Sequence, residues 1–429
     1  MWGMKKPARS KRKPTNAKTQ RTRSKRHKGK PGRAAVSLAT RRSRARGRTD
    51  GISLKGMRRM TQSMFGDEAH AKRVESLANG ATGVMVAKRA AIHAIGAAYA
   101  EVAEIKPKHG VKQVDRYLSN QGIDVEALTP SWTRFVLGSR REVIIALDWT
   151  EFDASDHSTL CAYVVTTHGR ATPLCWKTVQ KSTCTDGLRT EVEVELIERL
   201  ARAIPPEVAI TLLADRGFGN QVLYQVLELL GWEFVIRFRG NITVRYNGES
   251  KPASDWLPPS GRATKLRGAH VTHDQTPVGA VVVVRAKGMK DIWCLATNLA
   301  DTSAAAIARL YGRRFTIEET FRDQKDLRFG MGLRQTRIRK PARRDRLLML
   351  LAVAQALLTL LGAASERSGL DAYLKVNTVK RRTHSLFRQG SYWFGCLPTL
   401  REDWYKRLMA AFAEILAEQA EMREILGAI

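Results

Sequence analysis

Cysteines, acidic residues and long apolar segments are all scarce in this chain of 429 residues. Its five cysteines are scattered and include no Cys-x-x-Cys pair, which argues against a zinc site or a disulfide framework and favours a reducing compartment. No apolar segment follows the charged N-terminus, so we expect no signal peptide. One stretch, Leu347 to Ala364, reaches the lower length limit for a membrane span. Because Gln355 and Thr359 interrupt it and several arginines crowd one end, we predict a buried core helix.

Positive charge dominates the composition. The sequence has 73 lysines and arginines against 41 aspartates and glutamates, which gives a net charge of +32. Such a protein attracts polyanions, nucleic acid first and an acidic membrane surface second. The charge argues against an ordinary metabolic enzyme of small molecules, and it says nothing about the fold.

The positive charge is concentrated at the N-terminus. Residues 1–60 contain 22 lysines and arginines and a single acid, Asp50. Large apolar side chains are rare there, so little burial is available to offset the entropy of ordering the chain. We predict a disordered basic arm over residues 1–55. The alternative is that translation begins further along, at Met57, Met60 or Met64.

Local patterns predict a mixed α/β fold. Residues 67–128 are rich in alanine and charge and predict a small helical DNA-binding domain. Short β-branched runs then alternate with amphipathic helices, and glycine, proline, serine and asparagine recur over 240–299. We expect a helical domain at 56–138, a mixed-sheet core at 139–239 and 300–366, a mostly β insertion at 240–299, and a helical region at 367–429.

Individual elements follow from the same patterns. Strands are expected at 143–147, 159–166, 172–179, 208–213 and 233–238, and within the insertion at 241–246, 264–272, 278–285 and 291–296. Helices are expected at 188–204, 220–230, 303–327, 343–364 and 400–426.

Two carboxylates come directly after predicted strands. Asp148 follows the run Val143–Leu147, and Asp215 follows a second buried-type run. Sheets of α/β proteins place their chemistry at the carboxyl ends of strands. Asp153 and Asp156 are weaker candidates, because neither is expected to end a strand.

A third carboxylate lies on the predicted helix 303–327. Tyr311, Arg314, Glu318 and Lys325 are spaced by 3, 4 and 7 residues, which places all four within a sector of roughly 60°. The neighbouring Glu319 does not share that face. An exposed face with an ordinary i,i+4 ion pair between Arg314 and Glu318 would explain part of the pattern. The functional alternative is a metal-binding carboxylate among cations that hold a nucleic-acid backbone. Mg²⁺ prefers oxygen ligands, so Asp148, Asp215 and Glu318 are candidate ligands for Mg²⁺, with Mn²⁺ able to substitute.

These motifs resemble the insertion-sequence-4 family of bacterial DDE transposases. The resemblance is carried by Asp148, by Asp215 with Arg216-Gly217-Phe218 after it, and by Tyr311-x2-Arg314-x3-Glu318-x6-Lys325. It is closest to the branch containing the Tn-ten element, which also resembles this chain at Lys108-His109, Trp293 to Leu299 and Asn377-Thr378-Val379. The basic arm is a departure from the family.

The resemblance implies a ribonuclease-H-like core with a β insertion between the second aspartate and the glutamate. The spacings agree, with 67 residues from Asp148 to Asp215 and 103 from Asp215 to Glu318. It also implies that these three carboxylates bind metal and that Tyr311, Arg314 and Lys325 bind phosphate at the cleaved DNA end. By the same resemblance, Trp293 corresponds to a tryptophan in the family's insertion that stacks near a flipped-out base at the DNA hairpin. A core position for Trp293 is the alternative, with Trp256 as the second candidate for stacking.

The resemblance further implies a cut-and-paste transposase. Such an enzyme cuts double-stranded DNA at the terminal inverted repeats through a hairpin intermediate and joins the 3′ ends to target DNA. We expect a homodimer on paired ends in the bacterial cytoplasm, associated with the nucleoid and not with a membrane. Two alternatives remain: a catalytically inactive DNA-binding relative, and a basic RNA-binding or chromatin-like protein.

Overall fold

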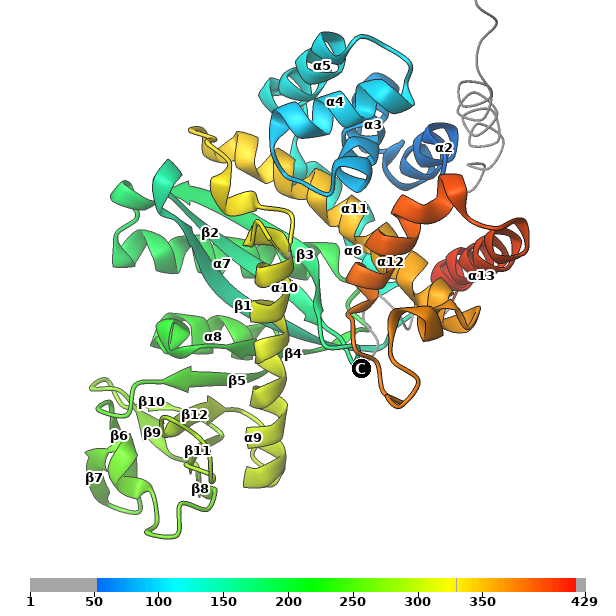
Figure 1. Cartoon of the computed structure of the whole chain (residues 1–429). Helices are drawn as coiled ribbons and strands as arrows, with labels where there is room; N and C mark the ends of the chain where they lie inside the picture. The colour runs from blue at the N-terminus through cyan, green and yellow to red at the C-terminus, as the bar shows by residue number, and fades with distance from the viewer. Residues whose placement is uncertain (1–51, 329, 422–429) are drawn as a thin grey trace, which may run out of the picture.

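A computed structural model of the chain describes residues 52–328 and 330–421 and shows helices packed against a large mixed sheet (Figure 1). The predicted basic arm lies outside the described residues except at its end, where Leu54 already begins a helix. The helices are α2 (Leu54–Phe65), α3 (Ala71–Ala87), α4 (Ile92–Val102), α5 (Pro107–Ser119), α6 (Val125–Leu137), α7 (Asp186–Ala203), α8 (Gln221–Leu229), α9 (Ala304–Gly312), α10 (Thr316–Lys325), α11 (Pro341–Arg367), α12 (Leu386–Cys396) and α13 (Glu402–Glu421). Helical patterning was therefore a reliable guide to the region before residue 138, although α6 was not predicted as a separate helix.

The main sheet has eight strands in the order β3-β2-β1-β4-β5-β12-β11-β8. Its strands are β1 (Glu142–Phe152), β2 (His157–Val165), β3 (Ala171–Gln180), β4 (Ala209–Ala214), β5 (Glu233–Phe238), β8 (Thr264–Arg267), β11 (Ala280–Val284) and β12 (Trp293–Thr297). Strands β1, β4 and β5 run parallel, and the remaining neighbours pair antiparallel. The mixed α/β prediction is confirmed, and β5 has the predicted bounds.

Strand β1 is longer than its apolar run. The prediction that a strand ends just before Asp148 is wrong, because β1 continues to Phe152 and Asp148 pairs with Cys161 of β2. The parallel pairing of β1 with β4, however, stops at Leu147, which lies opposite Ala214. Asp148 is therefore inside a strand but at the end of the parallel ladder.

The segment 240–299 is mostly β, as expected, but it contributes to two sheets. Strands β6 (Thr243–Tyr246), β7 (Glu249–Pro252), β9 (His270–Val271) and β10 (Thr276–Pro277) form a separate sheet in the order β10-β9-β6-β7. Strands β8, β11 and β12 instead extend the main sheet beyond β5, through the pairing of β12 with β5. The backbone groups on that side of β5 are thereby paired within the main sheet.

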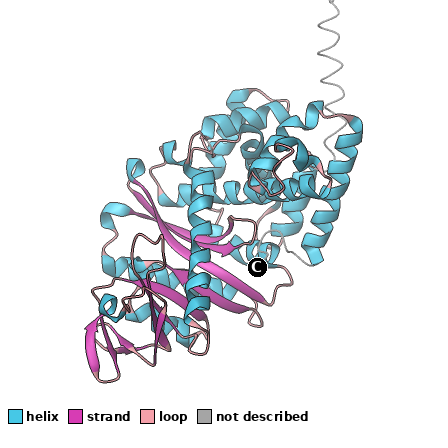
Figure 2. Ribbon diagram, turned by 60° about the horizontal axis from the view of Figure 1, so that its bottom comes forward, coloured by secondary structure: helices cyan, strands magenta, loops and turns pink. Residues whose placement is uncertain are grey.

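The predicted helix 303–327 is two helices. Helices α9 and α10 are joined by the 3₁₀ turn Arg313–Phe315, so the continuous helix expected there is interrupted. The pair still runs as one rod across the strands in both ribbon views (Figures 1 and 2). Helix α9 packs near β5 and β11, and α10 packs near β2 and β3. Helix α7 packs against β3 and α8 against β5.

Helix α11 is the apolar helix that has the length and composition of a membrane span. In this structure 94% of its most apolar window is buried inside the protein, which agrees with the predicted core helix. It packs against α3, α5, α12, α13 and β3. The crossing with α12 is tight, because a Cβ on Gly390 would overlap the carbonyl oxygen of Leu358. Glycine at this position allows the two helices to approach closely.

Candidate active site

The register of the main sheet brings the first two carboxylates together. Since Leu147 lies opposite Ala214 in the parallel pair, the next residues of the two strands, Asp148 and Asp215, are neighbours. Asp215 begins the 3₁₀ turn Arg216–Phe218, and its Oδ1 accepts a hydrogen bond from the Gly217 amide at 2.9 Å. Buried Phe218 anchors this turn. The local sequence thus fixes the Asp215 side chain just after the carboxyl end of β4.

Arg314 connects the sheet to the helix that carries the third carboxylate. Its guanidinium donates to Asp148 Oδ2 at 3.1 Å and also contacts Glu318 Oε1. The side chain of Arg314 is only 6% exposed, against 16% for Asp148 and 49% for Glu318. An ordinary surface ion pair between Arg314 and Glu318 does not explain this arrangement, because the arginine is buried and shared with a carboxylate of the sheet.

The electrostatics of Asp148 show that three carboxylates converge. Burial raises the pKa of Asp148 to about 7; Arg314 opposes the shift, and the negative charges of Asp215 and Glu318 reinforce it. A carboxylate in this environment gains from any further positive charge placed beside it. The structure therefore brings together the three acidic residues singled out from the sequence.

Helix α10 is held in place by polar contacts to the sheet and to α11. The Thr320 hydroxyl bonds both the amide and the carbonyl group of Ala171 on β3, at 2.7 and 3.0 Å. Gln324 accepts from the Tyr163 hydroxyl at 3.0 Å and donates to Gln355 of α11 at 2.9 Å. These buried hydrogen bonds fix the position of Glu318, which lies on the first turn of the same helix.

Tyr311 and Trp293 form an aromatic contact beside the carboxylates. Their ring centroids are 4.9 Å apart in an edge-on arrangement, and Phe315 lies 5.9 Å from Trp293. Tyr311 is fully buried, and its hydroxyl has no hydrogen-bond partner among the described residues. Burial raises the pKa of Tyr311, with Arg314 and Arg237 opposing the shift. Trp293 begins β12, where its neighbour Cys294 pairs with Phe238 at the carboxyl end of β5, and it is partly exposed.

The second candidate for base stacking lies elsewhere. Trp256 packs against Tyr246 at 5.7 Å, and Lys251 Nζ lies 4.0 Å from the centre of its ring. Both partners belong to the small four-stranded sheet. Of the two tryptophans, Trp293 is therefore the one in contact with the Tyr311 and Phe315 rings.

Lys325 lies at the far end of α10 beside a hollow of about 350 Å³. The hollow is lined by Glu318, Phe321, Arg322, Lys325, Asp326, Leu327, Arg334 and Gln335. Lys325 Nζ lies 5.0 Å from the centre of the Phe152 ring and 5.2 Å from that of Phe321. Burial lowers the pKa of Lys325, and the negative charge of Asp148 is among the influences that oppose the shift. Lys325 is thus close enough to Asp148 to interact with it electrostatically, and its role in binding phosphate stays a prediction.

Sequence reasoning missed a fourth buried carboxylate next to this cluster. Glu193 of α7 is 3% exposed and accepts a hydrogen bond from Trp149 Nε1 at 2.8 Å, on the face of β1 opposite Asp148. Burial raises the pKa of Glu193 to about 7, with the Trp149 bond opposing the shift and Asp215 adding to it. One signal was available: Glu193 shares a helix face with Ile197, four residues on, in an otherwise apolar stripe.

Arg237 of β5 is a second residue that sequence reasoning did not single out. Its charge acts on Tyr311, and it donates to the Ile292 carbonyl at 3.2 Å. The contact joins β5 to the residue just before Trp293.

The three carboxylates are suitable ligands for a divalent cation, although the structure does not arrange them as a metal site. Among residues 52–328 and 330–421, no three histidine, cysteine, aspartate or glutamate side chains are arranged as a ready metal site. The donors are nevertheless carboxylate oxygens, the type that Mg²⁺ prefers, and the charges of Asp215 and Glu318 add to the burial that raises the pKa of Asp148. Arg314 contacts two of them, so a cation would compete with its guanidinium for Glu318.

The part of the chain that carries these side chains matches a known protein family. The family model described as "Transposase DDE domain" matches residues 139–357, about half of the chain. The match begins just before β1 and ends within α11, so it includes all three carboxylates. No curated protein matches the chain.

Proposed function

The chain belongs to the transposase DDE domain family, and we propose on this basis that it is an active transposase of an insertion sequence. The family membership makes DNA its substrate. The observation that carries the proposal of activity is the convergence of Asp215 and Glu318 on Asp148, with the buried Arg314 in contact with Asp148 and Glu318. An inactive relative retained only for binding DNA would not need three carboxylates that repel one another.

Members of this family generally use divalent metal ions, and Mg²⁺ is our proposal for this chain, with Mn²⁺ as a substitute. Asp148, Asp215 and Glu318 would hold the metal. When bound, two such ions activate an attacking oxygen and stabilise a leaving one at a phosphodiester.

The surrounding side chains would bind and orient the DNA end. Arg314 is positioned to bind a phosphate oxygen once it no longer neutralises Glu318, and Lys325 faces the hollow next to Glu318. The buried hydroxyl of Tyr311 supplies a further hydrogen-bonding group beside Arg314. Trp293 is partly exposed next to Tyr311 and would offer an aromatic ring on which an unpaired base can stack. None of these residues needs to act as a nucleophile, because the attacking oxygen comes from water or DNA.

We further propose the finer assignments that the sequence motifs suggest. The part of the sheet ordered β3-β2-β1-β4-β5, with two parallel crossovers through helices, supports a ribonuclease-H-like core. The Tyr311-x2-Arg314-x3-Glu318-x6-Lys325 motif supports membership of the insertion-sequence-4 branch. From this branch assignment we also propose that the protein cleaves DNA through a hairpin and joins 3′ ends to target DNA. We further propose a homodimer on paired ends, located in the bacterial cytoplasm with the nucleoid.

A nicking assay tests the proposed function. Purified protein is incubated with supercoiled plasmid that carries the terminal repeats flanking the gene, in Mg²⁺ and in EDTA. We expect nicking and linear product in Mg²⁺ only, and none from Asp215→Ala at equal DNA binding. Wild-type protein that binds the plasmid but never cuts it in Mg²⁺ or Mn²⁺ would favour the inactive DNA-binding relative.

A further inference from the structure

Helices α4 and α5 form a two-helix unit, and α5 lies at the top edge of the molecule in Figure 1. Four residues, 103–106, join the two helices, and Glu104 in this turn has a left-handed backbone with a φ of 56°. The Ile105 amide closes the turn by donating to the carbonyl of Ala100 at 3.0 Å. Two helices joined by so short a turn have the layout of a helix-turn-helix unit, whose second helix enters the major groove of DNA.

The two helices cross at glycines. A Cβ on Gly110 would lie 2.2 Å from the carbonyl oxygen of Gly96, and a Cβ on Gly96 would lie 2.3 Å from the Cα of Val111. Glycine at both positions therefore allows the two backbones to approach closely. The buried residues of α5 are Gly110, Val114, Tyr117 and Leu118. The opposite face of α5 is left for solvent.

That opposite face is basic. Its exposed residues Lys108, His109, Lys112 and Arg116 fall within a sector of roughly 100° around the helix axis. Within the described part of the chain, none of these four side chains has a hydrogen-bonding or ion-pairing partner. Asp115, the one acidic residue of α5, is ion-paired with Arg343 of α11 at 2.6 Å. The positive charge on α5 is therefore available to an external anion.

Helix α11 fixes α5 relative to the candidate active site. Besides the pair of Arg343 with Asp115, Arg346 of α11 is buried and donates to the carbonyl of Leu118 at 3.0 Å. Further along α11, Gln355 accepts a hydrogen bond at 2.9 Å from α10, the helix that carries the third carboxylate. A ligand bound on α5 would thus be held in a fixed relation to the carboxylates.

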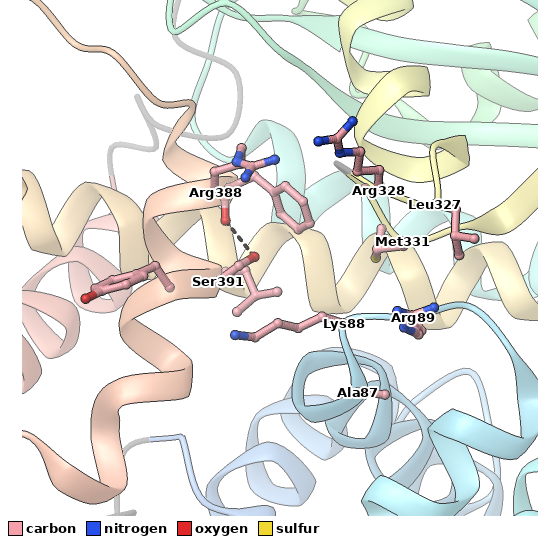
Figure 3. A pocket seen from close by; sticks show the side chains of 12 residues that line it. Ala87, Lys88, Arg89, Leu327, Arg328, Met331, Arg388 and Ser391 are labelled. Carbon is pink, nitrogen blue, oxygen red and sulfur yellow. Dashed lines mark hydrogen bonds between the residues drawn. The ribbon is translucent and has the colours of Figure 1, made fainter. Parts of the chain in front are cut away.

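A second group of basic residues, beyond the end of α10, differs from α5. These residues line a cavity of about 360 Å³ between the N-terminal helical region, the loop after α10 and helix α12 (Figure 3). Met331 and Phe387 are buried beneath it and form an apolar floor. The basic lining residues are Lys88, Arg89, Arg328 and Arg388. Arg328 and Arg388 already interact with other groups of the protein, so the charge of this cavity is partly compensated.

We propose that α5 lies in the major groove of duplex DNA and reads the terminal repeat of the element. That the ligand is DNA rests on the proposed transposase function. A helix of 13 residues is about 20 Å long and fits a groove about 12 Å wide. Lys112 lies at the centre of the basic face, where it can reach guanine O6 and N7, and Lys108 and Arg116 lie one turn to either side. The major groove of duplex RNA is too narrow to admit the helix.

The test compares two double variants that each remove two positive charges. One carries Lys108→Gln and Lys112→Gln. The matched control carries Arg202→Gln and Lys406→Gln, two exposed residues that are each ion-paired with a glutamate four positions earlier. Affinities for a duplex with the terminal repeat flanking the gene, and for a scrambled duplex of equal length, are measured by fluorescence anisotropy. Because all four side chains are exposed, both variants should melt at the wild-type temperature.

We expect the α5 variant to lose at least about tenfold in affinity for the repeat and less for the scrambled duplex, so that its preference for the repeat falls at least about fivefold. The control variant should keep the wild-type preference. Equal losses on both duplexes would mean that α5 contacts only phosphates, which would overturn the proposal, as would an unchanged preference. Competition by duplex RNA as effective as competition by the repeat would also contradict it.

A second measurement uses the unaltered protein. Guanine N7 lies in the major groove, so bound wild-type protein should block its methylation by dimethyl sulfate within the repeat, and the α5 variant should not. Metal-dependent nicking is scored separately. Wild-type protein that nicks DNA without protecting any guanine N7 in the repeat would refute this inference alone. Wild-type protein that protects the repeat but never nicks DNA would contradict the proposed activity and leave the role of α5 standing.

Discussion

Helix α10 separates two groups of basic side chains with different surroundings. Near its start, the guanidinium of Arg314 is in contact with the carboxylates of Asp148 and Glu318. Beyond its end, Lys88 and Arg388 line a cavity in which none of the described lining residues is acidic. In the first group, the positive charge of Arg314 is neutralised by carboxylates. A metal ion at the carboxylates and a phosphate at Arg314 could replace these contacts. The second group combines basic side chains with an apolar floor and has no acidic side chain among the described lining residues, so it offers no carboxylate ligand for a metal ion.

Loss of Arg314 should remove the cation that the first group shares between two carboxylates. Arg314→Ala leaves Asp148 and Glu318 without their shared cation and removes a phosphate-binding group. We expect cleavage to slow by at least about a hundredfold, the usual cost of removing one charge-stabilising donor from an active site. The measurement is the rate of plasmid nicking at saturating protein. The control is Arg309→Ala, an exposed arginine of α9. Similar nicking rates for the two variants would remove Arg314 from the site.

Trp293→Ala should have an intermediate effect that depends on the step. Stacking of a base on an aromatic ring contributes about 1–3 kcal/mol, which corresponds to roughly fivefold to 150-fold in rate. Hairpin formation and resolution should slow by that factor, and first-strand nicking should slow less, because the DNA end is less distorted then. Yields of nick, hairpin and resolved end give the measurement, with Trp256→Ala as the control. A core role for Trp293 predicts instead a lower melting temperature and equal losses at every step.

Glu193→Gln should change stability more than cleavage. Burial raises the pKa of Glu193 from 4.5 to about 7, so the folded state binds this proton more tightly than the unfolded state. Its contribution to stability is complete below about pH 4.5 and is lost as the pH rises to about 7. The total is about 3 kcal/mol. Glutamine carries no charge, so the variant should lack this part of the pH dependence while its amide oxygen still accepts from Trp149.

Unfolding by urea at several pH values in EDTA checks this prediction. Parallel stability curves for wild type and Glu193→Gln between pH 4.5 and 7 would show that the Glu193 pKa is not raised. Carboxylates with different partners thus lie on the two faces of β1. Asp148 contacts the Arg314 cation, whereas Glu193 accepts a hydrogen bond from the neutral indole of Trp149.

The sequence predicted those parts of the fold that depend on local patterns. Strand β5 was placed at its observed bounds, and the buried helix α11 was separated from a membrane span by the polar residues within it. The extension of β1 was missed because Asp148 and Glu151 break the apolar run, although both pair with β2. The 3₁₀ turn after α9 was missed because Arg313 and Phe315 are compatible with a continuous helix.

The features that the sequence did not predict depend on contacts between residues far apart in the chain. The local pattern of β12 shows a strand but not its partner, so its addition to β5 was not foreseen. In the candidate site, the i,i+4 spacing predicted the pairing of Arg314 with Glu318. The contact of Arg314 with Asp148 could not be predicted, because it joins residues 166 positions apart. The cavity residues Lys88, Arg328 and Arg388 come from distant segments, and each alone has the pattern of a surface charge.

Two adjacent glutamates provide the most direct test of the central claim. Glu318 contacts Arg314 at the carboxylate cluster, whereas Glu319 pairs with Arg322 and Arg170 on the other side of α10. Rates of Mg²⁺-dependent cleavage are measured for Glu318→Ala and Glu319→Ala at matched DNA occupancy. We predict that Glu318→Ala slows cleavage by at least about a thousandfold, since metal ligation contributes several kcal/mol to the transition state, and that Glu319→Ala stays within a few-fold of wild type. Wild-type cleavage by Glu318→Ala would contradict the account.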